Sequence, residues 1–285
     1  MAVKTRLRVL GAGLLLGAAL SLTGCSIFGD NSAPDLNKDA ANYTDREVEK
    51  IYSDAWKEIN NENWANAAKQ FDEVERQHPY SPWARRATLM SAYCYYMAGG
   101  ENYGLAISTA DNYISLHPGS PEVPYAFYLK AISLYEQIYD VGRDQSVTQD
   151  AMVALQDVVQ RFPDTEYAHD AKLKIDLTMD HLAAKEMNIG RYYLTRGDYI
   201  SAINRFKVVV TEYQTTPQIA EALERLTEAY YAIGVYNEAK AAAAVLGANY
   251  PGSTWYQSAY NLLQNRNLKP EASQGSWISK AFNIL

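Results

Sequence analysis

The segment 64-WANAAKQFDEVERQHP-79 contains the residue spacing from which the fold can be predicted. It has an aromatic residue at Trp64, a small residue at Ala67, an apolar residue at Phe71 and a proline at Pro79. Offsets of three and seven positions put the first three side chains on one face of an α-helix. The proline lies beyond the end of that helix, because proline cannot continue it. The stretch therefore predicts one amphipathic helix with a defined end.

The same spacing occurs five times along the chain, which indicates an internal repeat. In one copy a threonine replaces the aromatic residue, and in another the proline comes late. The four further copies are Tyr103, Ala106, Ala110 and Pro118; Thr148, Ala151, Leu155 and Pro163; Tyr199, Ala202 and Phe206 with the late Pro217; and Tyr236, Ala239, Ala243 and Pro251.

Each copy follows another amphipathic segment, so the repeating unit is a helix, a turn and a second helix. Residues 188–196, for example, lead through a Gly-Asp turn into Tyr199. The alanine anchors at positions 67, 106, 151, 202 and 239 lie 39, 45, 51 and 37 residues apart. This pattern resembles the tetratricopeptide repeat (TPR), whose period is about 34 residues. We therefore predict an all-α chain whose residues 45–265 form an αα-superhelical solenoid of about five TPR repeats.

Two segments of the chain are less regular. Residues 139–149 predict a loop between the two helices of the third repeat. The last segment, residues 266–285, is polar and then apolar. It fits a capping helix, a docking segment or a disordered tail, and the sequence leaves these three open.

The first 24 residues read as a signal peptide. Lys4, Arg6 and Arg8 precede an apolar run from Val9 to Leu22, which is too short to span a bilayer comfortably. The box LTGC at residues 22–25 resembles the lipobox of bacterial lipoproteins. That resemblance implies cleavage before Cys25 and an N-acyl diglyceride lipid on Cys25. Residues 25–44 then form a lipidated N-terminus and flexible tether, and serine at position 26 favours the outer membrane over the inner one.

The net charge and the cysteine content limit which classes of function are possible. Removal of residues 1–24 takes away three basic residues, so the mature net charge is (26 − 3) − 33 = −10. Such an acidic chain is unsuited to nucleic acid, whose binding depends on lysine and arginine contacts to phosphate. Cys94 is the one other cysteine, and its apolar helical surroundings predict a small core residue.

No catalytic or metal-binding motif is present, so we predict a protein that is not an enzyme and has no cofactor beyond the lipid. His78 and His117 directly precede repeat prolines and read as structural. Asp176, Asp180 and His181 share a helix, where a solvated face is the favoured interpretation. The sequence contains no metal-protease helix motif, no nucleophile elbow and no phosphate-binding loop.

A peptide-binding groove is the main site hypothesis. In TPR folds the first helix of each repeat faces the concave surface. Counting back from the alanine anchors places aromatic and small polar residues there, a combination that suits an extended peptide. The alternative is that some of them pack between adjacent repeats. The groove candidates are Tyr52, Trp56 and Asn60 in repeat one, and Thr88, Ser91 and Tyr95 in repeat two.

The anchor, tether and repeats together resemble the BamD family, the TPR lipoproteins of the outer-membrane β-barrel assembly (BAM) machinery. Local matches are YYLTRGDY at 192–199 with NRF at 204–206, DVGRDQ at 140–145 and YSPWA at 80–84. The resemblance implies a scaffold on the periplasmic face of the outer membrane. Its partners would be BamA, other BAM subunits and unfolded outer-membrane protein clients. Arg205 matches an arginine that the family uses near the BamA contact, and Asn204 is its neighbour.

Two other functions fit the same anchor and repeats. One is a TPR lipoprotein that scaffolds or activates periplasmic cell-wall synthesis enzymes. The other is an enzyme with an unrecognised site on the solenoid, which requires converging polar groups with shifted pKa values.

Overall fold

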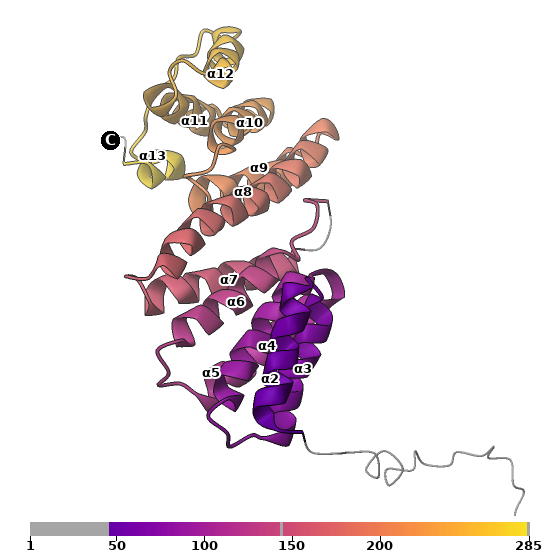
Figure 1. Cartoon of the computed structure of the whole chain (residues 1–285). Coiled ribbons are helices and arrows are strands. Elements are labelled where there is room, and N and C mark those ends of the chain that lie inside the picture. Colours follow the sequence, from indigo (N-terminus) through magenta and orange to yellow (C-terminus); the bar gives the residue numbers. More distant parts are fainter. Residues whose placement is uncertain (1–45, 143–144, 284–285) are drawn as a thin grey trace, which may run out of the picture. The chain divides into compact units, whose positions relative to one another are not determined.

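A computed structural model describes residues 46–142 and 145–283 (Figure 1). The signal peptide, Cys25 and the tether lie outside these residues. All regular elements in the described part are helices. They are α2 (Val48–Asn60), α3 (Trp64–Gln77), α4 (Ala84–Ala98), the short η1 (Gly100–Asn102), α5 (Tyr103–Leu116), α6 (Val123–Tyr135), α7 (Ser146–Arg161), α8 (Glu166–Thr195), α9 (Tyr199–Glu212), α10 (Ile219–Ala232), α11 (Tyr236–Asn249), α12 (Thr254–Gln264) and α13 (Trp277–Ala281).

Consecutive helices pack against each other from α2 to α12, as Figure 1 shows. The first helices of the five repeats are α2, α4, α6, α8 and α10, and the second helices are α3, α5, α7, α9 and α11. Helix α12 continues the stack by packing on α10 and α11. The predicted all-α solenoid of five helix pairs is therefore confirmed.

The repeat spacing has a direct structural basis in the second helices. Four of them begin at the first residue of the spacing, and α7 begins two residues before Thr148. The alanine and the apolar residue four positions later are fully buried in all five copies. All five helices also end in one conformation, with φ between −135° and −124° and ψ between 38° and 56° at the C-cap. His78 and His117 are two of these caps, which confirms their structural role.

Helix α8 explains why one repeat is longer than the others. It runs without interruption for 30 residues, and Gly190 within it is buried against the second helix of its own repeat. The spacing of 51 residues between the third and fourth alanine anchors therefore reflects one long helix. Helix α6 ends at Tyr135 and α7 begins at Ser146, so the loop predicted at residues 139–149 was placed three residues too late at its start and four too late at its end.

The C-terminal segment folds back onto the repeats. Helix α13 packs on α11 and α9, and Ile278 is fully buried there. The Trp277 indole Nε1 donates to the Tyr230 hydroxyl at 3.0 Å, and the Ser276 hydroxyl donates to Glu238 at 2.7 Å. Of the three possibilities for this tail, the structure selects an ordered segment that docks on its own solenoid.

Cys94 is fully buried in the core between α3, α4 and α5. Burial raises the pKa of its thiol to about 12, so the thiol stays protonated and unreactive at neutral pH. The expectation of a small core residue is confirmed.

Candidate partner-binding surfaces

Four of the six groove candidates are buried in the structure. Tyr52 is 7% exposed and Tyr95 5%, while Thr88 and Ser91 are almost completely covered. The Thr88 hydroxyl donates to Glu75 at 2.9 Å, and the Tyr95 hydroxyl donates to Asp72 at 2.6 Å.

These bonds tie α4 to α3. The Ser91 hydroxyl also bonds Asp72. The placement of Tyr52, Thr88, Ser91 and Tyr95 on an open surface was therefore wrong, and packing between helices is what they do. For the three residues of α4 the physical reason is that α4 packs against α3, α5 and α6, so little of its circumference stays open. Tyr52 of α2 is instead covered by the rings of Phe71 and Trp83.

The other two groove candidates remain accessible. Trp56 is 38% exposed and its ring meets Phe71 edge-on at 6.5 Å, while Asn60 is exposed at the end of α2. Only these two of the six still qualify as contacts for a bound peptide.

The structure reveals a layer of half-buried tyrosines on the first helices of repeats three and four. Tyr125 and Tyr128 of α6 both meet the Tyr167 ring of α8, at 5.4 Å and 5.3 Å. The Tyr128 hydroxyl donates to Asp170 at 2.7 Å. Burial is the main cause that raises the pKa of all three phenols, so they stay neutral donors. Counting from the alanine anchors missed them, although the high tyrosine content of these helices was a usable signal.

The two residues carried over from the family lie on α9. Asn204 is exposed, and the Arg205 side chain is 43% exposed. The Arg205 guanidinium Nη1 lies 3.2 Å from Glu186 Oε2 of α8. One ion pair leaves most of the five guanidinium donors of Arg205 available to another molecule.

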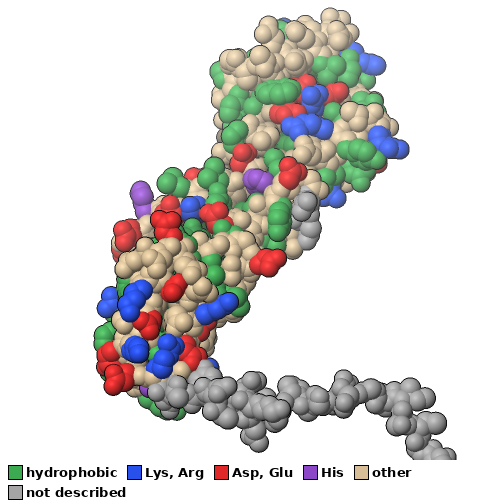
Figure 2. All heavy atoms as spheres, turned by 45° about the vertical axis from the view of Figure 1, so that its right-hand side comes forward, with side chains coloured by type: hydrophobic (Ala, Val, Ile, Leu, Met, Phe, Trp, Pro, Cys, Tyr) green, Lys and Arg blue, Asp and Glu red, His purple; other side chains and the backbone are tan. Residues whose placement is uncertain are grey.

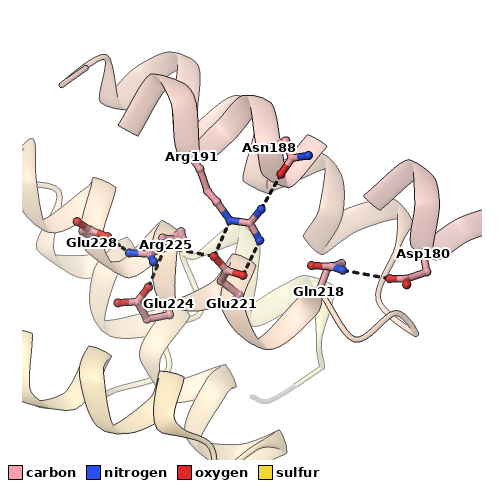
Figure 3. A network of polar contacts seen from close by, with 8 residues as sticks. All are labelled: Asp180, Asn188, Arg191, Gln218, Glu221, Glu224, Arg225 and Glu228. Carbon is pink, nitrogen blue, oxygen red and sulfur yellow. Dashed lines mark hydrogen bonds and ion pairs between the residues drawn. The ribbon is translucent and has the colours of Figure 1, made fainter. Parts of the chain in front are cut away.

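A polar network joins the first helices of repeats four and five (Figure 3). The Arg191 guanidinium of α8 meets the Glu221 carboxylate of α10 in a two-bond pair, at 2.8 Å and 2.7 Å, and also donates to Asn188 at 2.8 Å. The hydrogen bonds from Arg191 are the main cause that lowers the pKa of Glu221. Figure 3 shows the Arg191 side chain reaching across from its helix to the one below.

The network continues along α10. Arg225 Nη1 lies 2.8 Å from Glu228, and its guanidinium carbon stands 5.5 Å from the Trp255 ring of α12. Glu224 is only 7% exposed, and its Oε2 has no hydrogen-bond partner. Burial raises the pKa of Glu224 to about 7, with Arg225 opposing the shift. The charged residues of α10 lie three or four positions apart and so share one face of the helix. This spacing is visible in the sequence and could have predicted the network.

Charge is mixed over the face that Figure 2 presents. Acidic and basic side chains lie next to each other, with hydrophobic side chains between them. Within residues 46–142 and 145–283 no group of three or more histidine, cysteine or acidic side chains is placed to hold a metal ion. Asp180 instead accepts a hydrogen bond from Gln218 at 3.2 Å. In the same residues no helix is long and apolar enough to cross a membrane.

These features define a class of protein: a TPR-type helical scaffold whose exposed polar and aromatic surfaces suit protein partners. The family model described as "YfiO: Outer membrane lipoprotein" matches residues 44–246. The chain belongs to this family.

Three relatives extend the comparison. A Caulobacter vibrioides protein is 52% identical over 88% of this chain and 80% of its own length. A Rickettsia prowazekii protein is 41% identical over 87% of this chain and 96% of its own. A Neisseria meningitidis serogroup B protein is 32% identical over 87% and 94%. All three are named outer membrane protein assembly factor BamD.

Proposed function

We propose that this protein is a non-catalytic scaffold subunit of the BAM complex, which assembles β-barrel proteins into the outer membrane. The observation that carries the proposal is the match to relatives named as assembly factors over most of both chains. The repeat fold supports it, because a stack of helix pairs presents extended surfaces rather than an enclosed catalytic pocket.

The scaffold is held at the periplasmic face of the outer membrane by lipid on Cys25. The lipobox at residues 22–25 and the family description as an outer membrane lipoprotein support this anchor. One acyl chain binds a membrane only weakly, so stable attachment needs more than one chain on the same residue. A tether of about twenty residues then keeps the repeats at high local concentration beside the membrane.

BamA is the proposed partner of the α9 surface. Arg205 is exposed there beside Asn204, and it has one carboxylate partner, Glu186, on the neighbouring helix. A carboxylate of BamA can replace or share that partner in a charge-assisted contact. Unfolded outer-membrane proteins are the proposed clients of the first helices in the N-terminal repeats, where Trp56 and Asn60 stay accessible.

Affinity purification of the detergent-extracted lipoprotein tests the proposal. BamA should be recovered with it in stoichiometric amount, and mass spectrometry identifies both. Recovery of cell-wall synthesis enzymes without BamA would instead support the alternative function and contradict the proposed one.

Two variants test the individual assignments. Arg205→Glu should weaken recovery of BamA while circular dichroism still shows a folded helical protein. Arg196→Glu is the matched control, because Arg196 is also exposed but is held by Tyr192 of its own helix. Cys25→Ala should leave an unprocessed or mislocalised precursor, and normal membrane retention of that variant contradicts the lipid assignment.

A further inference from the structure

A pocket lies between α6 and α8, on the first helices of the third and fourth repeats. Its volume is about 310 Å³, which is room for one large side chain. It is lined by Tyr135, Glu136, Ile138, Leu177, Thr178, Asp180 and His181. None of these residues belongs to the groove that the sequence predicted.

The pocket opens beside exposed aliphatic side chains. Leu173 and Leu177 stand one helical turn apart on α8 and are 60% and 58% exposed. Leu177 also lines the pocket, so the apolar strip and the cavity are continuous. A contiguous apolar patch rimmed by polar side chains is a feature of interaction sites, whereas a single exposed leucine is ordinary, so it is the continuity of the strip with the pocket that matters.

The polar side chains at the pocket give its rim a negative charge. Glu136 is exposed and makes no ion pair with the described residues. Asp180 has a single hydrogen bond, from the neutral Gln218. Lys174 of α8, which reaches the Tyr135 ring at the pocket, is already engaged by Asp170 at 3.4 Å. The rim therefore favours a positively charged group on the occupant.

His181 adds an independent observation. Its Nδ1 is buried and has no hydrogen-bond partner. Buried polar atoms without a partner are rare, and those that occur concentrate at functional sites. The ring lines the same pocket as Leu177, one helical turn away.

We infer that the α6–α8 pocket is a docking site for an extended client peptide that carries a large apolar side chain next to a lysine or arginine. The apolar side chain fills the pocket and covers Leu177, and the basic residue meets Glu136 or Asp180. An extended segment fits better than a folded surface, because a small pocket accepts one side chain while the backbone continues along the leucine strip. The inference rests on the proposed client-handling function and adds a second client contact, in repeats three and four, to the one proposed at Trp56 and Asn60.

Peptide binding to the full-length lipoprotein in detergent tests the inference. The probe is the fluorescein-labelled peptide Gly-Ser-Lys-Phe-Lys-Ser-Gly, and its charge-reversed counterpart has glutamate in place of both lysines. Fluorescence anisotropy gives the affinities, with protein-free micelles as the blank. The basic peptide should bind roughly tenfold more tightly than the acidic one, the factor expected for one favourable contact.

Variants then locate the binding. Leu177→Glu should weaken binding of the basic peptide by roughly tenfold or more. Glu136→Lys should make the protein bind the acidic peptide more tightly than the basic one. Ile200→Glu is the matched control, because Ile200 is 60% exposed on a different helix, and it should bind as the parent does.

Equal binding of both peptides, or equal effects of the Leu177 and Ile200 substitutions, overturns the inference. Neither result affects the proposed function, since the recovery of BamA is measured separately and through the α9 surface.

Discussion

Glu221 and Glu224 lie one turn apart on α10, yet only Glu221 is fully paired. Glu221 accepts two bonds from Arg191, whereas the buried Oε2 of Glu224 accepts no hydrogen bond and has only an ion pair with Arg225 Nε at 3.5 Å. The pKa of Glu221 is lowered, and the pKa of Glu224 is raised to about 7. Two identical side chains on one helix therefore make opposite contributions to the pH dependence of folding.

Glu224→Gln should raise the melting temperature at pH 8. The pKa of Glu224 in the folded state is about 7, above its ordinary value of 4.5. The folded protein therefore loses stability as pH rises between these two values. A neutral amide avoids the buried charge. Thermal melts at pH 5 and pH 8 check this, and the advantage of the variant should shrink at pH 5. An advantage that is independent of pH contradicts a buried, titrating Glu224.

Glu221→Gln is the matched opposite case, with the same change of charge on the same helix. Because Arg191 lowers the folded-state pKa of Glu221, its stabilisation is present at neutral pH and is lost as pH falls through that lowered value. The variant should therefore melt below the parent at pH 7 and approach it below about pH 4. Equal melting temperatures at pH 7 argue against a contribution from the pair.

Arg191→Lys should restore only part of what Arg191→Ala loses. Lysine cannot form the planar two-bond contact with Glu221 that the guanidinium makes. We expect a loss of about 1–2 kcal/mol for the alanine variant, because Arg191 is 38% exposed and solvent screens the pair. Urea denaturation measures both variants, and a lysine variant as stable as the parent means that only net charge matters.

Gly190→Ala should destabilise the fourth repeat. A Cβ at Gly190 would lie 2.8 Å from Cδ1 and Cζ of the fully buried Phe206 ring. Overpacking of this kind costs about 1–3 kcal/mol. Gly104→Ala near the start of α5 is the control, since a Cβ there meets nothing within 4 Å and alanine is the better helix former. Thermal melts should move in opposite directions for the two variants.

Ile278→Ala should release the C-terminal segment before the repeats unfold. Ile278 is fully buried, while Lys280 of the same short helix is exposed, so Lys280→Ala is the control. Limited proteolysis should cut the isoleucine variant between α12 and α13 faster than the parent or the control. Equal cutting of all three proteins means that Ile278 does not hold the tail.

The repeat architecture could be predicted because its signal is local and periodic. The anchors Ala67 and Phe71 and their counterparts determine which face of each second helix is buried, and the prolines mark where that helix ends. The same periodicity does not reveal how many neighbours a helix has. Thr88, Ser91 and Tyr95 were assigned to an open face for that reason, although their helix is enclosed by three others.

The contacts between residues far apart in the chain could not be predicted from the sequence. Arg191 and Glu221 are thirty positions apart, and Trp277 meets Tyr230 across 47 positions. Such pairs depend on the crossing of whole helices, which no local spacing encodes. The ends of the second helices are the opposite case, because they are local. In four of the five helices the C-cap residue directly precedes the repeat proline, and α9 ends in the same conformation at Tyr213 although its proline comes later, at Pro217.

Helix α8 has a mechanical consequence. Its 30 residues make a continuous rod about 45 Å long, with no proline to break it. The pocket beside Leu177 lies near the middle of this rod, and Glu186 and Arg191 follow within the next four turns. A peptide that tilts α8 at the pocket would tilt the partner of Arg205 with it. Under the proposed function, a client bound at the pocket and BamA bound beside Arg205 would therefore be coupled mechanically through one continuous helix.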